Sequence, residues 1–305
     1  MEKNSQRLIE KVWKSEPTIE GAGVHLKRAF GFHEVPLLDP FLLLDDFRSE
    51  NPAHYKDGFP WHPHRGIETI TYVLDGDVEH GDSMGHKGAI SSGDVQWMTA
   101  GGGIIHQEMP KGNKKGQMFG FQLWANLPAK SKMMNPRYRS IKKKEIPLIT
   151  TQEGVKVRII SGEVEGTQGP VQDIIAGPEY FDVEIPQGKS FTHMVKDGHN
   201  VFAYVIEGEA YFDSLRAPFA HEAAGKNYFD MAPSCPCGDG TLVLYKREGS
   251  YLTVTSDKRP VRFLLASGKP LNEPIAWYGP IVMNTQAELR EAFREYQAGT
   301  FIKGQ

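Results

Sequence analysis

Hydrophobic residues along this chain gather in short runs rich in valine, isoleucine, tyrosine and phenylalanine, with glycine and proline between the runs. The clearest runs lie at 69–74, 155–160, 180–185, 201–206, 241–246, 251–256 and 261–266. Many short runs of this composition, separated by turn-forming residues, predict β-strands of a sandwich or barrel. Long helical periodicity is scarce, so we expect an all-β fold.

One segment near the C-terminus has a helical pattern instead. In NTQAELREAFREYQAG, residues 284–299, the apolar residues Leu289, Phe293 and Tyr296 fall on one face of a helix. Asn284 or Thr285 can cap its start, and Gly299 can end it. We expect this helix to pack on a sheet.

Two segments resemble each other at a distance of about one domain length. ITYVLDGDVEHGDS (70–83) and FAYVIEGEAYFDS (202–214) each contain a β-type run, an acidic residue followed by glycine, and a second short run. The acidic residue and glycine between two runs predict a hairpin. The similarity predicts a duplicated β-domain, and we expect domains at 1–135 and 136–305.

Composition and charge exclude some classes of partner. The net charge is −3, which gives no electrostatic reason to expect direct binding of nucleic acid. The early apolar run 41–44 is far too short to cross a membrane, and the first residues lack the apolar region of a signal peptide. The two cysteines, Cys235 and Cys237, lack the C-x-x-C spacing and are expected to be incidental thiols. We therefore expect a cytoplasmic protein in a reducing compartment.

Two pairs of polar residues carry the chemistry of the chain. His62 and His64 are two residues apart in FPWHPHRGIETITYVLDG, and His106 and Glu108 have the same spacing in an apolar run that follows three glycines. Residues at this spacing in an extended segment point to the same face. Two such pairs on neighbouring strands could bring three nitrogens and one carboxylate to one point. The pattern predicts a metal site.

Three histidines and one carboxylate leave open positions on a six-coordinate ion. Open positions are typical of a catalytic metal rather than a structural one. The ligand types suit Fe, Mn, Co, Ni, Cu or Zn, and the sequence does not choose among them.

Several segments together resemble one family of cupins, the pirins. They are LLDPFLLLDDF (37–47), FPWHPHRGIETITYVLDG (59–76), GDVQWMTAGGGIIHQEMP (93–110), QLWANLP (122–128) and YGPIVMNT (278–285). They occur in the order of the family and span nearly the whole chain. The resemblance implies a bicupin: two jelly-roll β-barrels face to face, with one divalent transition metal, most often iron, in the N-terminal barrel.

The resemblance also implies a ligand set of His62, His64, His106 and Glu108. Glu68 is the carboxylate that many other cupins use, and it shares the parity of His62 and His64 along the chain. Following the pirin pattern, we expect Glu108 to bind the metal and Glu68 to support the site or form a salt bridge.

Other positions near these ligands, and further histidines, also carry expectations. Many pirins have arginine at the position of Gly102, a change expected to alter the charge near the metal, and the three glycines around it predict a tight turn with positive φ. His80 and His86 are expected to be loop histidines. The second domain has His193 and His199 six residues apart instead of a paired motif, so no second metal site is expected there. His193 is expected to be the remnant of a lost site.

The resemblance implies two alternative functions. The first is a dioxygenase of the quercetin 2,3-dioxygenase type, which opens a flavonol ring with O₂ and releases carbon monoxide, with Glu108 as the base that removes the 3-hydroxyl proton. Its substrates would be a small planar flavonol-like aromatic and O₂. Phe59, Trp61, Met98 and Trp124 flank the metal motifs and can form core or pocket. The second function is a metal- or redox-dependent regulator that binds a protein partner.

Overall fold

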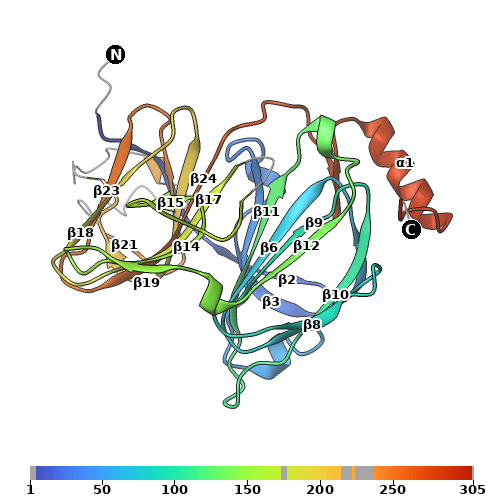
Figure 1. The fold of residues 1–305 in the computed structure, drawn as a ribbon, viewed down its shortest axis with the longest axis horizontal. Coiled ribbons are helices and arrows are strands. Elements are labelled where there is room, and N and C mark those ends of the chain that lie inside the picture. Colours follow the sequence, from blue (N-terminus) through green and yellow to red (C-terminus); the bar gives the residue numbers. More distant parts are fainter. Residues whose placement is uncertain (1–4, 173–176, 214–221, 224–235, 304–305) are drawn as a thin grey trace. The chain divides into compact units, whose positions relative to one another are not determined.

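The computed structural model describes residues 5–172, 177–213, 222–223 and 236–303. Strands account for most of these residues, and one α-helix lies near the C-terminus (Figure 1). All seven hydrophobic runs form strands, so the expected all-β class with a C-terminal helix is confirmed. No helix among the described residues is long and apolar enough to cross a membrane. Cys235 lies outside the described residues, and Cys237 is half-buried.

The chain forms two compact units, each made of two separate segments. We call the unit of residues Glu16–Glu145 and Leu271–Gln305 the N-terminal barrel, and the unit of Met1–Ser15 and Ile146–Pro270 the C-terminal barrel. The first residues of the chain therefore belong to the C-terminal barrel, and the last residues belong to the N-terminal barrel. The continuous domains expected at 1–135 and 136–305 do not contain this exchange of terminal segments.

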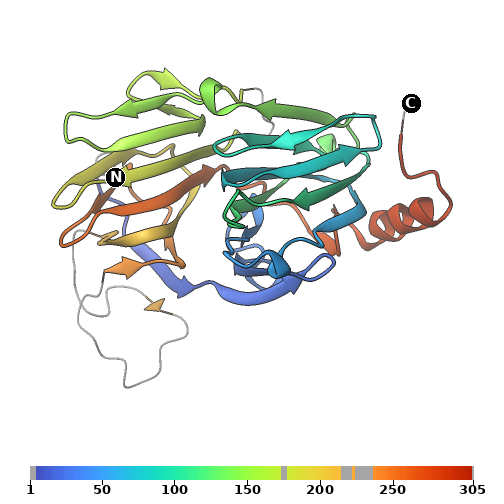
Figure 2. The ribbon, with the colours of Figure 1, turned by 90° about the horizontal axis from the view of Figure 1, so that it is seen from below.

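The N-terminal barrel is built from two main sheets (Figure 2). Its seven-stranded sheet has the order β12 (Arg137–Ile141), β9 (Val95–Thr99), β6 (Ile67–Asp75), β11 (Phe119–Asn126), β4 (Phe41–Asp46), β3 (Val24–Phe30) and β2 (Glu16–Glu20). Its four-stranded sheet has the order β5 (Phe59–His64), β10 (Ile104–Pro110), β7 (Val78–Asp82) and β8 (Lys87–Ile90). A short hairpin of β25 (Ala276–Tyr278) and β26 (Ile281–Met283) precedes the helix α1 (Gln286–Gln297).

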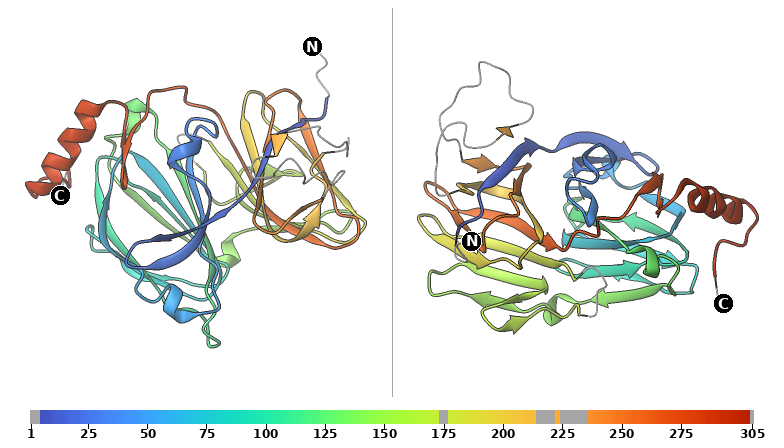
Figure 3. Two further views of the ribbon diagram at one scale, coloured as in Figure 1. Left: turned by 180° about the vertical axis from the view of Figure 1, so that it is seen from behind. Right: turned by 90° about the horizontal axis from the view of Figure 1, so that it is seen from above.

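The C-terminal barrel repeats this arrangement. Its main sheet has the order β13 (Leu148–Thr150), β14 (Lys156–Ser161), β17 (Glu179–Ile185), β24 (Val261–Gly268), β19 (Asn200–Ala210), β22 (Thr241–Tyr245), β1 (Ile9–Lys14) and β20 (Glu222–Ala223). The smaller pairs are β18 (Ser190–Met194) with β23 (Tyr251–Thr255), β15 (Glu163–Val164) with β16 (Thr167–Gln168), and β21 (Cys237–Gly238) with β19. Figure 3 shows β1, in blue, beside the orange strands of this barrel.

Seven consecutive strands of the C-terminal main sheet match the seven strands of the N-terminal one in order, which confirms the duplicated β-domain. The order β2-β3-β4-β11-β6-β9-β12 corresponds to β13-β14-β17-β24-β19-β22-β1. Strand β1 therefore takes the place in the C-terminal barrel that β12 takes in the N-terminal one. The two similar sequence segments both begin in matching strands, β6 and β19.

The hairpins predicted inside these two segments are wrong. After Asp75 and Gly76 the chain leaves the seven-stranded sheet, and β7 pairs with β8 and β10 rather than with β6. In the second segment, β19 runs on through Glu207 and Gly208 with only an irregularity in its pairing with β24. A glycine at positive φ bends the chain at both places, at Gly76 and Gly208, but in a barrel corner or a bulge rather than a hairpin turn.

The two barrels differ in what fills them. The core of the C-terminal barrel is an apolar cluster contributed by its main sheet and by β18 and β23. In the N-terminal barrel, β10 alternates buried and half-buried residues, and the buried face carries His106 and Glu108. On the facing sheet, the buried residues Thr69 and Thr71 of β6 belong to the same interior. Duplication has therefore kept the strands and changed the chemistry of the interior.

The helix α1 forms as the sequence predicts. The Thr285 hydroxyl accepts a hydrogen bond from the Glu288 amide, and the Glu288 carboxylate accepts one from the Thr285 amide, which completes a capping box. Gly299 follows the helix with φ of 71°. Leu289 and Ala292 are buried, and contacts of α1 with β25 and β26 anchor it to the N-terminal barrel.

Buried cations hold the exchanged terminal segments in place. In the N-terminal barrel, the Lys132 ammonium donates to the carbonyls of Gly66 and Val282 and to the Asn126 side chain. In the C-terminal barrel, the fully buried Arg7 guanidinium donates to four backbone carbonyls, of Lys196, His199, Lys246 and Gly249. Burial lowers the pKa of Lys132 to about 7, because its partners are neutral oxygens rather than a carboxylate.

Candidate metal centre

Three histidines of the N-terminal barrel converge on one point. Strands β5 and β10 are antiparallel neighbours in which His106 lies opposite His62 and Ile104 lies opposite His64. The side chains of His62, His64 and His106 point into the barrel, and one ligand atom from each lies within 4.8 Å of the others. Both paired motifs of the sequence therefore reach the same interior, as their spacing predicts.

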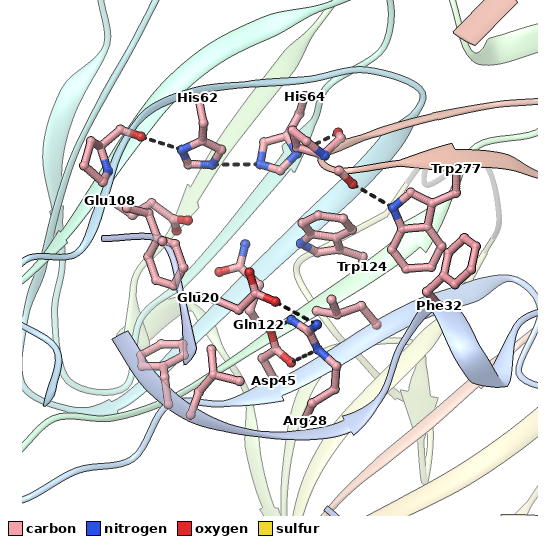
Figure 4. Close-up of a pocket in the computed structure, with 18 of the residues that line it drawn as sticks. Glu20, Arg28, Phe32, Asp45, His62, His64, Glu108, Gln122, Trp124 and Trp277 are labelled. Atoms are coloured by element: carbon pink, nitrogen blue, oxygen red, sulfur yellow. Dashed lines mark hydrogen bonds and ion pairs between the residues drawn. The ribbon is translucent and has the colours of Figure 1, made fainter. Parts of the chain in front are cut away.

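The hydrogen bonds of His62 and His64 fix which ring nitrogen carries the proton. His62 Nδ1 lies 2.8 Å from the Pro60 carbonyl oxygen, and His64 Nδ1 lies 3.2 Å from the Pro280 carbonyl oxygen. A carbonyl only accepts, so both Nδ1 atoms donate, and each neutral ring has its lone pair on Nε2. The two Nε2 atoms face each other at 3.0 Å (Figure 4). Two lone pairs at this distance repel unless a cation lies between them.

His106 completes the pattern because neither of its ring nitrogens makes a hydrogen bond. Its Nδ1 and Nε2 atoms are buried and make no hydrogen bond in the structure. An unpaired buried imidazole costs free energy unless a ligand or an ion satisfies it. The residues present therefore fit a metal ion.

Burial keeps the three rings in the form that binds metal. It lowers the pKa of His62 and lowers the pKa values of His64 and His106 well below their usual value, and neighbouring histidines lower those two further. Neutral imidazole is the metal-binding form.

The spacing of the nitrogens also bears on the geometry of an ion. Two ligands at about 2.1 Å from a metal are about 3.0 Å apart at a right angle and about 3.4 Å apart at a tetrahedral angle. The separation between the Nε2 atoms of His62 and His64 is 3.0 Å. The pair therefore has about the spacing of two nitrogens that bind the same ion.

Glu108 lies beside the three histidines but outside their group. Its Oε1 atom accepts a hydrogen bond of 2.9 Å from the Thr71 hydroxyl, and its Oε2 atom lies 4.0 Å from His106 Nε2. Burial raises the pKa of Glu108 to about 6, although hydrogen bonds from Thr71 and Gln122 oppose this rise. One oxygen of the carboxylate is thus held by the protein, and the other is directed toward the histidines.

Glu68, the alternative carboxylate, faces away from the histidines. It accepts a hydrogen bond of 2.7 Å from the Thr99 hydroxyl and lies on the face of β6 opposite to Thr71. The parity that Glu68 shares with His62 and His64 does not carry over, because Gly66, at φ of 79°, turns the chain from one sheet into the other. Burial raises the pKa of Glu68, although the hydrogen bond from Thr99 opposes this rise.

The three glycines form the predicted tight turn between β9 and β10. Gly101 and Gly103 have φ of 51° and 142°. A side chain at Gly102 would contact the Met133 carbonyl at 3.3 Å, and Gly102 does not line the pocket of the metal centre. A side chain at position 102 would therefore begin against the backbone at Met133.

A pocket of about 700 Å³ opens onto the histidines. Its walls are mostly apolar, include several aromatic rings, and come from β2, β3, β4, β5, β10, β11 and the segment around β25 (Figure 4). Of the aromatic residues that flank the motifs, Phe59 and Trp124 line the pocket, Met98 is core and Trp61 is exposed. The Trp124 ring packs edge-on against His64 with centroids 5.1 Å apart.

Several residues of the site could not be found from motifs. The C-terminal segment supplies the Pro280 carbonyl to His64 and the Trp277 ring to the pocket wall. Arg28 and Asp45 line the far side of the pocket. The only sequence signal was that YGPIVMNT is one of the pirin-like segments.

The prediction of loop histidines fails for His80. It lies in β7 opposite Glu108, is buried, and forms a hydrogen bond of 2.5 Å between its Nδ1 atom and the Tyr138 hydroxyl. His86 follows β7 and lies near Asp82, with Nδ1 2.8 Å from the carboxylate. The polar interior therefore extends past Glu108, away from the pocket.

In the C-terminal barrel, the strand pair that corresponds to β5 and β10 is β18 with β23. Strands β18 and β23 pair so that Phe191 lies opposite Val254 and His193 lies opposite Leu252. In the pairing of β5 with β10, the same places are held by His62 opposite His106 and by His64 opposite Ile104. His193 matches His64, and its Nε2 atom lies 3.6 Å from the Glu179 carboxylate.

Comparison with known proteins identifies the family of the chain. The Pirin family model matches residues 23–125, and the model of the pirin C-terminal cupin domain matches residues 180–302. A pirin-like protein of Caulobacter vibrioides is 40% identical over 296 residues, which are 97% of this chain and 99% of the relative.

Solved structures of related proteins have the same fold. The crystal structure of a quercetin 2,3-dioxygenase from Acinetobacter baumannii is 32% identical, has a TM-score of 0.83 and matches 97% of this chain and 99% of its own. The Escherichia coli pirin YhhW in complex with nickel(II) shares the fold, with 19% identity, a TM-score of 0.61 and coverage of 85% of this chain and 98% of its own. The chain, with its two cupin barrels and its three converging histidines, belongs to the pirin family.

Proposed function

We propose that this chain is a metal-dependent dioxygenase that opens the ring of a flavonol-like substrate with O₂. The observation that carries the proposal is the pair of facing Nε2 atoms of His62 and His64, 3.0 Å apart at the inner end of an aromatic pocket. The name of the Acinetobacter baumannii relative supports the type of reaction.

The metal would be held by His62, His64, His106 and Glu108. We propose iron, while the donor set also suits Mn, Co, Ni, Cu and Zn. When bound, the ion would supply the Lewis acidity that favours the ionised 3-hydroxyl of the flavonol, together with the redox chemistry with O₂.

The pocket suits a flat aromatic substrate. The rings of Trp124 and Trp277 lie with their centroids 6.0 Å apart on one side of the pocket. Phe47 and Phe59 also line the pocket. A pocket that is mostly apolar with a few directed polar groups is typical of small-molecule sites. A flavonol would place its 3-hydroxyl and 4-carbonyl toward the histidines.

Glu108 is the proposed base for the 3-hydroxyl proton, since its carboxylate can alternate between binding the ion and accepting a proton. The hydrogen bond from Thr71 holds Oε1, which leaves Oε2 on the side of the histidines to receive a proton. Gln122 also donates toward the carboxylate and keeps it in position. The proton moves from the substrate hydroxyl to Oε2, and addition of O₂ to the ionised flavonol then opens the ring with release of carbon monoxide.

The test is oxygen uptake and carbon monoxide release on quercetin by the metal-loaded protein. We expect both in the wild type and a loss of at least about 100-fold in Glu108→Gln, since general base catalysis contributes about 10²–10⁴-fold. Glu79→Gln is a matched control, because Glu79 is exposed and pairs with Lys111. Normal ring opening by Glu108→Gln would exclude Glu108 as the base, and no oxygen uptake by the wild type would exclude the proposed activity.

A further inference from the structure

The pocket has a second polar end, away from the histidines. Arg28 donates two hydrogen bonds to Asp45, Nε to Oδ1 and Nη2 to Oδ2, both at 2.8 Å. Its Nη1 atom donates to Glu20 Oε1 at 2.9 Å. All three residues line the pocket, and Figure 4 shows them across it from His62 and His64. None of them takes part in holding the proposed metal.

The two polar ends are joined by one row of residues across the sheet. Arg28 is paired with Asp45, Asp45 with Gln122, and Gln122 with Thr71, on four neighbouring strands. Thr71 in turn donates to Glu108. Neighbouring strands are about 4.8 Å apart, so the row spans about 14 Å from Arg28 to Thr71. A ligand bound at the histidines reaches Arg28 and Asp45 only with its remote end.

The charges at this end select against an anionic ligand. One guanidinium faces two carboxylates, so the group of Glu20, Arg28 and Asp45 has one net negative charge at neutral pH. Burial raises the pKa of Asp45 to about 6, which still leaves it mostly ionised at pH 7.5. A carboxylate or sulfate on the ligand would meet like charge at this end, whereas a neutral hydroxyl would not.

A phenolic hydroxyl fits this group in both of its roles. The Asp45 carboxylate has acceptor capacity left after its two bonds to Arg28, and the guanidinium has five N–H groups, of which three are used. A hydroxyl can therefore donate to the carboxylate and accept from the guanidinium at once. The Asp45 side chain is 9% exposed, so water competes little for this bond.

We propose that Asp45, held by Arg28 and Glu20, determines specificity for a neutral polyphenol by binding a hydroxyl on the end of the substrate remote from the metal. This rests on the proposed function for the orientation of the ligand. It adds the substrate class: flavonols hydroxylated on an outer ring, in preference to bare or anionic ones.

The experiment measures dissociation constants without turnover. Quercetin, which has four hydroxyls on its outer rings, and 3-hydroxyflavone, which has none there, are titrated into the protein as purified, under nitrogen. A hydrogen bond to a buried charged group is worth at least about tenfold in affinity, so the wild type should bind quercetin at least about tenfold more tightly. Galangin, hydroxylated on the fused ring alone, then tells which outer ring reaches Asp45.

Variants locate the preference. Asp45→Asn should lower the quercetin to 3-hydroxyflavone ratio about tenfold and Glu20→Gln severalfold, through weaker binding of quercetin alone. Glu20 is 42% exposed, so its variant will fold even if Asp45→Asn does not. Asp46→Asn is the matched control: Asp46 is the next residue, is held by Arg48 in the same two-pronged way, and points to the opposite face of β4.

The outcomes separate this inference from the proposed activity. Equal binding of the two flavonols by the wild type, or an unchanged ratio in both Asp45→Asn and Glu20→Gln, would overturn it. A ratio that falls in these variants and not in Asp46→Asn supports it. If the ratio falls in this way but no oxygen is consumed, the specificity stands and the dioxygenase proposal fails.

Discussion

The Nδ1 atom of His64 lies 3.2 Å from the carbonyl oxygen of Pro280, a residue 216 positions further along the chain. This contact fixes the ring with its Nε2 lone pair toward His62 and His106. The C-terminal segment therefore belongs to the metal centre as well as to the rim of the pocket. The contacts that attach this segment to the barrel can be removed by mutation, and the effect on metal binding can be measured.

Arg65 provides that attachment directly after His64. Its buried guanidinium donates to Glu295 Oε2 at 2.7 Å and to the Phe301 carbonyl at 2.8 Å. In Arg65→Met these bonds are lost, so we expect about 2–4 kcal/mol less stability and roughly tenfold weaker metal binding, because the support of His64 loosens. Metal competition assays and urea unfolding measure the two effects.

A control variant lies on helix α1, which also carries Glu295. Glu291 is exposed and pairs with Arg294, so Glu291→Gln should change neither quantity. Metal affinity that is the same in Arg65→Met and in the wild type would mean that the C-terminal segment does not orient His64.

Arg7 has the corresponding role in the C-terminal barrel. Its side chain is fully buried, and its bonds to four carbonyls tie the segment before β1 to the rest of that barrel. We expect Arg7→Met to lower the free energy of unfolding by about 3 kcal/mol or more, because buried carbonyls lose their donors. Circular dichroism during urea unfolding tests this, with Lys14→Met, which removes an exposed ammonium, as the control. A loss below about 0.5 kcal/mol, the usual range for surface changes, would refute it.

The register match between the barrels predicts that a metal site can be restored. Phe191 and Val254 stand where His62 and His106 stand, and His193 already matches His64. The double change Phe191→His with Val254→His should raise the metal content from one to two ions per chain. Adding His193→Ala to the double variant should bring it back to one. A folded double variant that still holds one ion would show that the strands match in pairing but not in side-chain geometry.

Glu179 predicts a loss of stability in acid. His193, Ser267 and Lys196 surround its carboxylate and lower its pKa to about 2 against the opposing effect of burial. The folded pKa lies below the unfolded value of about 4.5, so the stabilisation is complete above pH 4.5 and is lost as the pH falls toward 2. A shift of this size is worth about 3 kcal/mol at neutral pH.

The measurement compares urea unfolding of the wild type and Glu179→Gln at pH 7 and pH 3. The wild type should be more stable at pH 7 by about 3 kcal/mol, and the difference should shrink at pH 3. Glu153→Gln, at an exposed pair with Lys189, serves as the control. A difference that is the same at both pH values would rule out this assignment of the acid sensitivity.

The sequence predicted those parts of the site that depend on local geometry. The spacing of His62 with His64, and of His106 with Glu108, works because side chains two residues apart in one strand share a face. The helix expected within residues 284–299 was found for a similar reason, since its cap at Thr285 and its apolar face lie within one segment. Such patterns are local, and the fold does not alter them.

What failed depends on where the chain changes sheets. The parity argument allowed Glu68 to face the metal because it assumed one continuous strand from His62, but Gly66 turns the chain between two sheets. The hairpins predicted at Gly76 and Gly208 failed because the same residues serve in corners and bulges. The exchange of terminal segments could not be predicted from local patterns, because the pairing of β1 with β22 joins distant parts of the chain.

The metal content of freshly purified protein tests the central claim most directly. We predict about one first-row metal ion, iron by our proposal, per chain of the wild type. His62→Ala and His64→Ala should remove it, while His193→Ala, at the matching position of the other barrel, should retain it. Wild-type protein that holds no metal under any loading condition, or that keeps its metal in both His62→Ala and His64→Ala, would contradict the account.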